Sequence, residues 1–426
     1  MDVAGARPAP YGPVPMTRGH GIRGCAVVAV LAALLCAPAA SAAARARYDA
    51  HTVVVQYRDR APAAQRSLAA RTAGVLETLG AISGLGAQVV RVSGDPARVA
   101  ERLNRSSTVA YAEPNYIYRA TATPNDPLFG QLYGLSAISA PLGWDAARLG
   151  AFPASGGAEI GIVDTGIDAG HEDLAGKVVA CAGVRSFGIN LLGLVSLFDD
   201  PTIVPGRCAD DNGHGTHVAG TAAALANNGR GIAGVSFDSP LAICKALDAN
   251  GQGSLADIAN CIAYLSAQGA KIISLSLSGP ADARTLSNAV AAASNNGALL
   301  VAAAGNDGAA APSYPAAYPQ VVSVAAVDRN GAHAPFSTAN ADVEVSAPGV
   351  DILSTWLGGG YRTLSGTSMA TPHVAGVAAI IAARNPGAGA AAWRAKLTSA
   401  VDDLGPKGRD PQFGFGRVDL RKAVAP

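Results

Sequence analysis

Three short stretches of the sequence place side chains of three chemical types in distinctive surroundings. Asp164 ends the stretch IVD ahead of a Thr-Gly turn, His214 stands in NGHGTHVAG, and Ser368 stands in LSGTSMATPHVAG. A carboxylate, an imidazole and a hydroxyl are the groups that nucleophilic acyl transfer combines: the hydroxyl attacks, the imidazole takes its proton, and the carboxylate orients the imidazole. Taken singly, Asp164 could be a turn-forming aspartate and Ser368 a helix-capping serine.

The histidine motif also invites comparison with a zinc site, because His214 and His217 stand at positions i and i+3. The stretch lacks the glutamate base of the HExxH zinc motif, and it offers no third ligand. His214 instead follows a glycine-rich turn at the start of an apolar helix, where an imidazole can exchange protons near neutral pH. The motif therefore favours proton transfer over zinc binding.

The residues between the motifs predict the scaffold that positions them. From about residue 158 onward, apolar strands alternate with amphipathic helices, and we expect strands at EIGIVD, LAICKAL, KIISLSLS, GALLVAAAGN and VVSVAAVD. This pattern indicates an α/β fold with a doubly wound, mostly parallel sheet covered by helices on both faces. Asp164 would then lie at the carboxyl end of a strand, which is where such sheets place their functional sites.

The sequence predicts two helices from clear local signals, and the first of them begins at Ser368. The stretch MATPHVAGVAAIIAA after Ser368 predicts a buried, closely packed helix with Pro372 near its start. A serine at that helix terminus would place its own N–H and the positive end of the helix dipole beside any oxyanion that its attack creates. The stretch SLADIANCIAYLSAQG predicts a second helix capped by Ser254.

A smaller unit precedes this domain. HTVVVQY and AQVVRV alternate like strands, residues 64–79 are helix-like, and Asp95 followed by Pro96 predicts the start of a second helix, ARVAERLN. The stretch STVAYAEPNYIYRA closes the unit with a further strand, and the polar residues at 120–127 suggest a linker. The order of elements predicts a small ferredoxin-like α+β domain.

Composition and the N-terminus limit the choice of compartment and partners. The chain has 426 residues, of which 49% are hydrophobic and 15% charged, so it can bury a sizeable core. Residues 1–42 combine three arginines, a short apolar run and small residues at 40–42, as a signal peptide does, and the run is too short for a membrane anchor. We expect a secreted, extracellular monomer without membrane attachment. Residues 120–426 carry a net charge of −6 and no basic stripe, which argues against nucleic acid.

Four cysteines remain beyond residue 42, and an oxidising compartment would allow them to form two disulfides. Three pairings are possible. We favour the pairing of Cys181 with Cys208 and of Cys244 with Cys261, because each bridge encloses a local segment. The spacing contains no CxxC pair of the kind that binds zinc.

The three motifs together resemble those of a known family. IVDTGID, NGHGTHVAG and GTSMATPHVAG are similar to the signatures of the subtilisin-like serine proteases, the subtilases, over roughly residues 126–420, and are nearest in character to the thermitase-like branch. The resemblance implies that Asp164 orients His214, that His214 acts as general base and then acid, and that Ser368 attacks the scissile carbonyl. It also implies that Asn306, in VAAAGNDG, donates a hydrogen bond to the oxyanion.

The resemblance further implies where a protein or peptide substrate binds. Residues 274–280 resemble the segment that pairs with an extended peptide, and the facing wall of the specificity pocket would come from Ala303, Ala304 and Gly305. The expected pairing residues are Ser276, Leu277, Ser278 and Gly279. Ser278 replaces a glycine that is usual in the family, so the shape of the cleft departs from the common form. The segment could also be simply a buried strand.

The N-terminal unit is similar to the inhibitory propeptides of the family. We therefore expect a signal peptide at 1–42, an inhibitory propeptide domain at 43–119 and a catalytic domain at 120–426, with a cut near Arg119. The propeptide would act as an intramolecular inhibitor until the zymogen processes itself. Its net charge of +5 is compatible with docking on the acidic catalytic domain.

A structural calcium site is also implied. NDPLF, HEDL and NNGRGIAG are similar to the strong calcium site of the thermitase-like branch. The resemblance assigns side-chain oxygens to three ligands and main-chain carbonyls to three more: Asp126, Asp173, Asn228, Leu225, Arg230 and Ile232. Oxygen ligands from separate loops suit calcium. Arg230 is a charged departure from the family pattern, and a solvated turn is the alternative.

Two other functional classes deserve comparison. A catalytically silent binding protein could retain the same scaffold, although every catalytic position holds a competent residue. A Rossmann-type oxidoreductase would share the parallel sheet, but no G-x-G-x-x-G follows the first strand of the larger domain. The sequence thus predicts a secreted serine endopeptidase.

Overall fold

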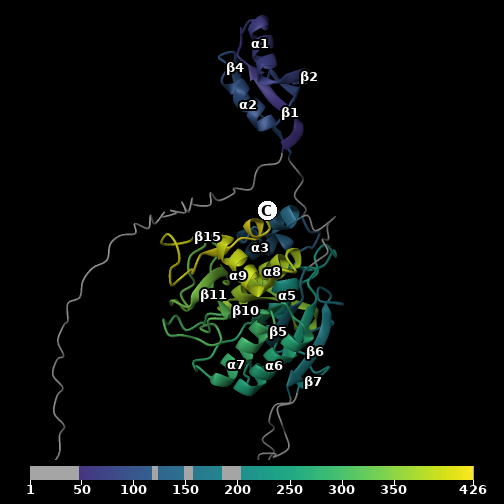
Figure 1. Ribbon diagram of the computed structural model, residues 1–426. Helices are drawn as coiled ribbons and strands as arrows, with labels where there is room; N and C mark the ends of the chain where they lie inside the picture. Colours follow the sequence, from purple (N-terminus) through teal and green to yellow (C-terminus); the bar gives the residue numbers. More distant parts are fainter. Residues whose placement is uncertain (1–47, 118–122, 148–156, 185–202, 426) are drawn as a thin grey trace, which may run out of the picture. The chain divides into compact units, whose positions relative to one another are not determined.

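The computed structural model describes residues 48–117, 123–147, 157–184 and 203–425. It contains a four-stranded sheet, a ten-stranded sheet and a two-stranded hairpin (Figure 1). The predicted signal peptide and the predicted cut near Arg119 lie outside the described residues. The boundaries predicted at residues 42 and 119 stay predictions.

The four-stranded sheet belongs to the N-terminal unit, whose elements follow the order β-α-β-β-α-β. They are β1 (Tyr48–Tyr57), α1 (Ala63–Ala73), β2 (Val75–Ile82), β3 (Ala87–Val92), α2 (Pro96–Asn104) and β4 (Val109–Tyr116). The strands are antiparallel in the order β2-β3-β1-β4, which is the predicted ferredoxin-like arrangement. Asp95 caps α2 as expected, because its side chain accepts the N–H of Ala97.

One prediction in this unit is wrong. The helix expected at 64–79 ends at Ala73, and the residues that follow Gly74 form strand β2. Gly74 takes the left-handed conformation, with φ 95°, and its N–H bonds to the carbonyls of Ala70 and Arg71, which terminates the helix. Strand β2 is an exposed edge strand held by pairing with β3, so side-chain periodicity did not reveal it.

The ten-stranded sheet organises the larger domain. Its order is β15-β16-β12-β11-β10-β9-β5-β8-β6-β7, and every pair from β16 to β6 is parallel. The strands are β5 (Ile160–Asp164), β6 (Val178–Val184), β7 (Ile203–Pro205), β8 (Leu241–Lys245), β9 (Ile272–Leu275), β10 (Leu299–Ala303), β11 (Val321–Val327), β12 (Val343–Pro348), β15 (Val401–Asp402) and β16 (Arg417–Val418). The five predicted strands correspond to β5, β8, β9, β10 and β11.

Helices cover both faces of this sheet, as predicted. Helices α5 (His214–Ala223) and α8 (Thr367–Arg384) pack on one face, and α6 (Leu255–Gln268) and α7 (Arg284–Asn295) on the other. The other helices are η1 (Phe129–Gln131), α3 (Tyr133–Ala137), α4 (Ala140–Ala147), η2 (Leu357–Gly359), α9 (Gly389–Ser399) and α10 (Leu420–Ala423). No helix in the four described stretches combines the length and the apolar character that a membrane crossing requires.

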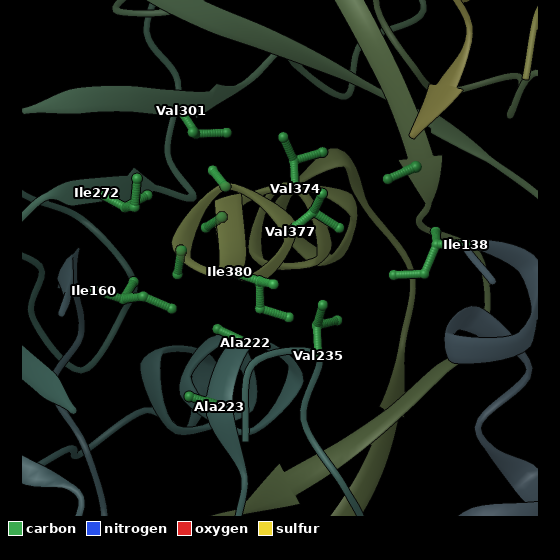
Figure 2. Packing of buried hydrophobic residues seen from close by; sticks show 14 of the residues in the cluster. Ile138, Ile160, Ala222, Ala223, Val235, Ile272, Val301, Val374, Val377 and Ile380 are labelled. Carbon is green, nitrogen blue, oxygen red and sulfur yellow. The ribbon is translucent and has the colours of Figure 1, made fainter. Parts of the chain in front are cut away.

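Helix α8 lies at the centre of the larger core. Val374, Val377 and Ile380 of α8 belong to one buried cluster with the alanines of α5 and residues of strands β5, β9 and β10, and Ile380 lies on the side of α8 towards Ala222 (Figure 2). Gly376 is needed at the contact, since a Cβ there would lie 2.6 Å from the Cβ of Val235. The predicted buried, closely packed helix after Ser368 is confirmed.

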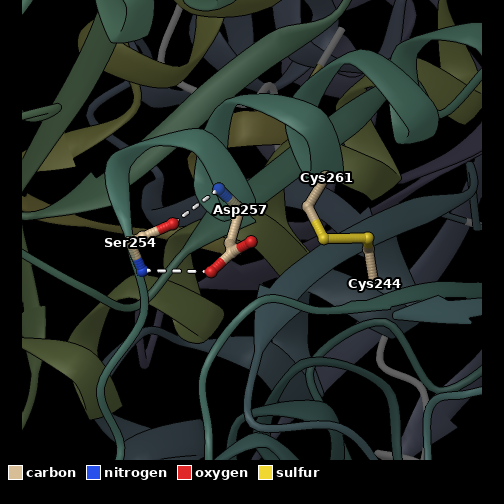
Figure 3. The surroundings of a disulfide bond; sticks show 4 residues. All are labelled: Cys244, Ser254, Asp257 and Cys261. Carbon is tan, nitrogen blue, oxygen red and sulfur yellow. Dashed lines mark hydrogen bonds between the residues drawn. A yellow bond between two sulfur atoms is a disulfide. The ribbon is translucent and has the colours of Figure 1, made fainter. Parts of the chain in front are cut away.

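A disulfide joins strand β8 to helix α6 on the opposite face. Cys244 and Cys261 are bonded and fully buried, and the helix starts with a capping box in which Ser254 and Asp257 exchange hydrogen bonds (Figure 3). The second disulfide joins Cys181 to Cys208. Both favoured pairings are therefore confirmed, and so is the cap at Ser254.

The hairpin of β13 (Ile352–Trp356) and β14 (Gly360–Leu364) directly precedes α8. Its first strand packs on α5: Ser354 and Thr355 donate their hydroxyls to the carbonyls of His217 and Thr216, at 2.7 Å each. The hairpin was not predicted from the sequence. It joins the helix that carries His214 to the segment that leads to Ser368.

Candidate active site

Asp164 is the last residue of β5 and is completely buried. Its Oδ1 accepts the N–H of Thr165 and the Nδ1–H of His214, at 2.7 Å each. Its Oδ2 has no hydrogen-bond partner within the described part of the chain. The next turn requires glycine, because Gly166 has φ 117° and a Cβ there would lie 2.6 Å from the carbonyl oxygen of Cys208. A buried carboxylate is thus directed at the imidazole.

His214 is the first residue of α5, and its side chain is 25% exposed. Gly213 precedes it with φ 104°, and a Cβ there would lie 2.5 Å from the ring of Trp356, so glycine alone fits the turn. Burial lowers the pKa of His214, but the charge and hydrogen bond of Asp164 outweigh burial, helped by the charge of Asp210, and the pKa lies above its ordinary value. The hydrogen bond at Nδ1 therefore fixes the orientation of the imidazole, and the raised pKa favours its uptake of a proton.

Ser368 lies in the first turn of α8, which begins at Thr367. Its hydroxyl donates to the carbonyl of Ser276 at 3.1 Å, and the hydroxyl of Ser276 donates in return to the carbonyl of Ser368 at 3.0 Å. In this structure the hydroxyl proton of Ser368 is given to a main-chain oxygen and not to His214. The start of the helix nevertheless places the N–H of Ser368 and the positive end of the helix dipole beside the serine oxygen.

Asn306 follows strand β10 and has an amide of defined orientation. Its Oδ1 accepts both the N–H and the hydroxyl of Thr367, at 2.8 and 2.9 Å. These two donors leave Nδ2 as a hydrogen-bond donor near the start of α8. Gly366 keeps this nitrogen uncovered, since a Cβ at residue 366 would approach Nδ2 to 3.4 Å. The amide of Asn306 is thus attached to the first residue of α8, and its role as oxyanion donor stays a prediction.

The candidate substrate segments leave two neighbouring parallel strands at the same edge of the sheet. Strand β9 ends at Leu275, inside the sheet, and Ser276, Leu277, Ser278 and Gly279 continue beyond it. Gly279 pairs with Tyr314 through two N–H···O bonds of 2.8 Å. Strand β10 ends at Ala303, and Ala304 and Gly305 follow it, with the Gly305 carbonyl accepting the N–H of Thr338 at 3.0 Å.

The candidate calcium ligands come together from three separate loops. Asp126 accepts the N–H groups of Asn227 and Asn228, at 2.8 and 3.1 Å. Asp173 accepts the N–H of Ile232 and the side-chain nitrogen of Asn228, at 2.8 Å each. Both carboxylates are buried, and no lysine or arginine of the described stretches forms an ion pair with either. Burial raises the pKa of Asp126, and the nearby charge of Asp173 adds to the effect.

The contacts of Arg230 and Leu225 are compatible with the predicted calcium site, whereas the side-chain orientation of Asn228 differs from it. The guanidinium of Arg230 points to Glu172, with 2.8 Å between Nη1 and Oε2, so the charged side chain turns away from the two aspartates. Leu225 donates its N–H to the carbonyl of Asp173 at 2.8 Å, which ties its loop to the cluster. The Oδ1 of Asn228 instead accepts the N–H of Arg230 at 2.8 Å. The described residues contain no cluster of three or more His, Cys, Asp or Glu suited to a metal, so carbonyl oxygens would have to complete any site.

Sequence reasoning missed one charged residue of the site, Asp210. Its carboxylate accepts N–H groups on both sides of His214, from Gly213 and Thr216, at 2.9 Å each. An acidic residue shortly before a helix start is a known capping signal, and the stretch DDNGHG carries it. Because the neighbouring Asp211 satisfies the same signal, the sequence alone did not single out Asp210.

Comparisons with known proteins show the family of this chain. A family model described as the subtilase family matches residues 155–416, and a model described as the fervidolysin N-terminal prodomain matches residues 37–115. The chain is 44% identical to thermitase of Thermoactinomyces vulgaris over 303 residues, which cover 71% of this chain and 99% of thermitase. It is 39% identical to the thermophilic serine proteinase of Bacillus sp. (strain AK1) over 334 residues, which cover 78% of this chain and 76% of that protein.

A solved structure gives the same result. A protease from Pseudoalteromonas arctica is similar with a TM-score of 0.62 and 30% identity, over 71% of this chain and 99% of the other. The resemblance inferred from the three motifs is therefore confirmed, together with the fold class and the prodomain. The chain belongs to the subtilase family of serine endopeptidases.

Proposed function

We propose that Asp164, His214 and Ser368 form the catalytic triad, and that Ser368 forms an acyl-enzyme with the substrate. The observation that carries the proposal is the 2.7 Å bond between Asp164 Oδ1 and His214 Nδ1 at the end of β5. It fixes the tautomer that leaves Nε2 free to accept the serine proton. A buried carboxylate with a partly exposed imidazole is the arrangement that nucleophilic catalysis requires.

The reaction follows from these positions. When a peptide carbonyl approaches, Ser368 exchanges its bond to the Ser276 carbonyl for one to His214 and attacks the carbonyl carbon. His214 takes the hydroxyl proton, and the imidazolium is stabilised by Asp164. The negative oxygen of the tetrahedral intermediate accepts hydrogen bonds from Nδ2 of Asn306 and from the N–H of Ser368. His214 then protonates the leaving amine. Water next attacks the acyl-enzyme: His214 takes a proton from the water and returns it to the oxygen of Ser368.

The substrate would bind as an extended strand between the two segments that follow β9 and β10. Ser276, Leu277 and Ser278 would pair with its main chain, and Gly279, whose own N–H and carbonyl are bonded to Tyr314, would hold this segment in place. Ala303–Gly305 would line the pocket for the residue before the cut. Ser278 is exposed and would narrow this cleft on one side. Main-chain pairing gives affinity with little dependence on side chains, which suits an enzyme that acts on many proteins.

The N-terminal unit would act as the inhibitor and processing substrate of the same chain. We infer that the enzyme is exported through residues 1–42 and is cut near Arg119 by its own active site. We further infer that it acts outside the cell as a monomer. The match of residues 37–115 to a prodomain supports this order of parts. A catalytically silent binding protein would need a defective site, and nothing in the geometry of Asp164 and His214 favours that alternative.

Labelling with a fluorophosphonate tests the proposed nucleophile. We expect wild-type enzyme to be labelled, and Ser368→Ala to lose the label and to accumulate as the uncut precursor. Ser365→Ala is the matched control, because Ser365 is an exposed hydroxyl three positions earlier in the sequence. Labelling that persists in Ser368→Ala, or normal processing of that variant in a protease-free host, would contradict the proposal.

We also propose a structural calcium ion held by Asp126, Asp173 and Asn228 with the carbonyls of Leu225, Arg230 and Ile232. The support is two buried carboxylates without a cationic partner in the described stretches, together with loops that supply hard oxygens. The ion would neutralise the two aspartates and bind the loop 225–232 to the rest of the domain. Asn228 would have to turn its oxygen towards the ion.

Chelation tests this site in the mature enzyme. EDTA is expected to lower the melting temperature, and calcium to restore it, because the ion stabilises only the folded state. Asp126→Asn should abolish the calcium dependence, whereas Asp248→Asn, in an exposed loop, should retain it. A melting temperature that is the same with and without chelator would exclude the site.

A further inference from the structure

The loop ahead of helix α5 holds a second carboxylate close to His214. Oδ1 of Asp210 accepts the N–H groups of Asn212 and Gly213, at 3.0 and 2.9 Å. Oδ2 accepts the N–H and the hydroxyl of Thr216, at 2.9 and 2.6 Å. Two of these residues precede His214 and one follows it. A single side chain therefore fixes the main chain on both sides of the imidazole.

The same loop is attached to the residues that follow Asp164. The N–H of Asp210 donates to the carbonyl of Ile167 at 3.2 Å, and the N–H of Asp168 donates to the hydroxyl of Thr216 at 2.9 Å. Residues 167 and 168 belong to the turn that leaves strand β5. Asp210 thus links the helix that carries the imidazole to the segment that carries its carboxylate partner.

Asp210 is an anion at neutral pH. Burial alone would raise its pKa, but the hydrogen bonds from Gly213, Thr216 and Asn212 outweigh burial and hold the pKa below its ordinary value. The four hydrogen bonds that it accepts leave no place for a proton on either oxygen. Its charge also raises the pKa of His214, by less than the charge of Asp164 does.

Other charged groups on the neighbouring elements leave this effect intact. His217, one turn further along α5, has a pKa lowered to about 4 by burial and stays neutral. Lys245 of β8 contacts the carbonyl of Thr165, but its charge is paired with Asp211 at 2.6 Å. Arg362 of β14 stacks on the ring of Trp356, 4.6 Å from its centroid. The net field at the imidazole is therefore dominated by Asp164 and Asp210.

We propose that Asp210 is a positioning residue for the reaction: it holds the turn that carries His214 in register with Asp164 and supplies a second negative charge that favours the imidazolium. The proposal rests on the proposed triad, because it concerns the proton that His214 takes from Ser368. It adds a function for a residue whose side chain, among the described residues, bonds to Asn212, Gly213 and Thr216 and not to Ser368. Catalysis should then depend on the charge of Asp210, and not only on its hydrogen bonds.

The pH dependence of kcat/KM of the processed enzyme tests the proposal. Activity falls at acid pH as His214 becomes protonated, so the acid limb reports its pKa. Asp210→Asn removes the anion and should move this limb to lower pH by on the order of half a unit. We expect kcat to fall while KM changes little, because the turn that carries His214 loses its register. Asp210→Ser is the second neutral variant, in case the asparagine amide clashes with the N–H of Thr216.

Three control variants separate charge from structure. Asp168→Asn removes an equal charge from the adjacent turn, where the carboxylate accepts from Gly170 and Gly358, and should leave the acid limb in place. Thr216→Ala removes one hydrogen bond of Asp210 but keeps the anion, so stability should fall and the limb should stay. Asp210→Glu keeps the charge with altered geometry, so kcat should fall while the limb stays.

The outcomes distinguish this inference from the proposed function. An acid limb that is unchanged in both neutral variants, or that moves as far in Asp210→Glu as in them, would overturn the role of Asp210 and leave the triad untouched. Fluorophosphonate labelling that survives in Ser368→Ala would instead overturn the triad itself. A limb that moves equally in Asp168→Asn would show a general effect of surface charge, which also contradicts the proposal.

Discussion

At the scale of single residues, the site depends on groups whose orientation is fixed by neighbours that take no part in the chemistry. Asn306 is the clearest case. Its amide oxygen is occupied by Thr367, so the nitrogen is directed outward before any substrate arrives. An asparagine after a strand is usually a turn residue, and only the resemblance of the sequence around Asn306 to the family suggested that this residue binds the oxyanion. The motifs therefore predicted Asp164, His214 and Ser368, whereas Asp210 became visible only through its contacts.

Replacement of Asn306 tests this orientation. Asn306→Ala is expected to lower kcat on the order of 10²–10³-fold with little change in KM, which is the loss already known for this donor in subtilisin. The proposed donor would act on the oxyanion of the transition state and tetrahedral intermediate and not on the carbonyl of bound substrate, so ground-state binding should not suffer. Steady-state kinetics with a chromogenic peptide would measure both constants. A variant that raised KM alone would show that Asn306 only binds substrate.

Asn250→Ala is the control for that experiment. Asn250 lies in an exposed loop, and its side-chain nitrogen contacts only Asp248 among the described residues, 3.5 Å from Oδ2, so loss of the side chain should change neither constant. Circular dichroism of both variants would show that the fold is kept. An equal fall of kcat in the two variants would point to a general loss of active protein.

At the scale of elements, the sequence predicted those whose signals are local. Strands β5, β8, β9, β10 and β11 are continuous apolar runs, and α6 has a cap at Ser254 and a glycine at its end. Strand β2 was missed because its exposed side chains carry no strand pattern, so that only its pairing with β3 orders it. The hairpin β13–β14 was missed for a similar reason, since its partner α5 lies far away in the sequence. Non-local pairing overrides local preference at such places.

The disulfide between β8 and α6 offers a prediction at this scale. Replacing Cys244 and Cys261 together by alanine should lower the free energy of unfolding by about 3 kcal/mol, because the bridge closes a short loop in the unfolded chain. Ser254→Ala, at the start of the same helix, should cost about 1 kcal/mol. Urea unfolding of these variants in the Ser368→Ala background avoids self-digestion. A larger loss for Ser254→Ala than for the cysteine pair would contradict this ranking.

At the scale of the whole molecule, the ten-stranded sheet separates two apolar cores of the larger domain. The core that contains α5 and α8 also encloses the imidazoles of His217 and His373, which are almost wholly buried. Nδ1 of His373 contacts the carbonyl of Met369 at 2.9 Å, and Nε2 of His217 lies 3.0 Å from the carbonyls of Ile352 and Arg362. These side chains pack as neutral groups, so the stability of the core is linked to pH.

Burial lowers the pKa of His217 and of His373 to about 4. Unfolded histidines titrate near pH 6.5, so the unfolded chain takes up protons first as the pH falls. The free energy of unfolding should therefore be highest above about pH 6.5 and fall between there and about pH 4, by on the order of 3 kcal/mol for each histidine. The raised pKa of His214 has the opposite sign and acts above pH 6.5, where its contribution to stability is lost as the pH rises, so it leaves the fall between pH 6.5 and 4 unchanged.

Melting temperatures of Ser368→Ala protein between pH 4 and 7 would measure the effect. His373→Gln should flatten the dependence on pH, even though it lowers stability overall. The exposed His51 is the control, and His51→Gln should leave the slope as it is. If melting temperature depends on pH equally with and without His373→Gln, groups other than His373 cause the acid sensitivity.

The central place of helix α8 has a consequence for the cell that makes the enzyme. Ser368 stands at the start of that helix, and its apolar side chains fill the space between α5 and strands that precede it in the chain. A ribosome must therefore release nearly all of the sheet before the proposed nucleophile acquires the setting in which it would react. Such long-range assembly is slow, so the nascent polypeptide stays harmless to its neighbours during synthesis.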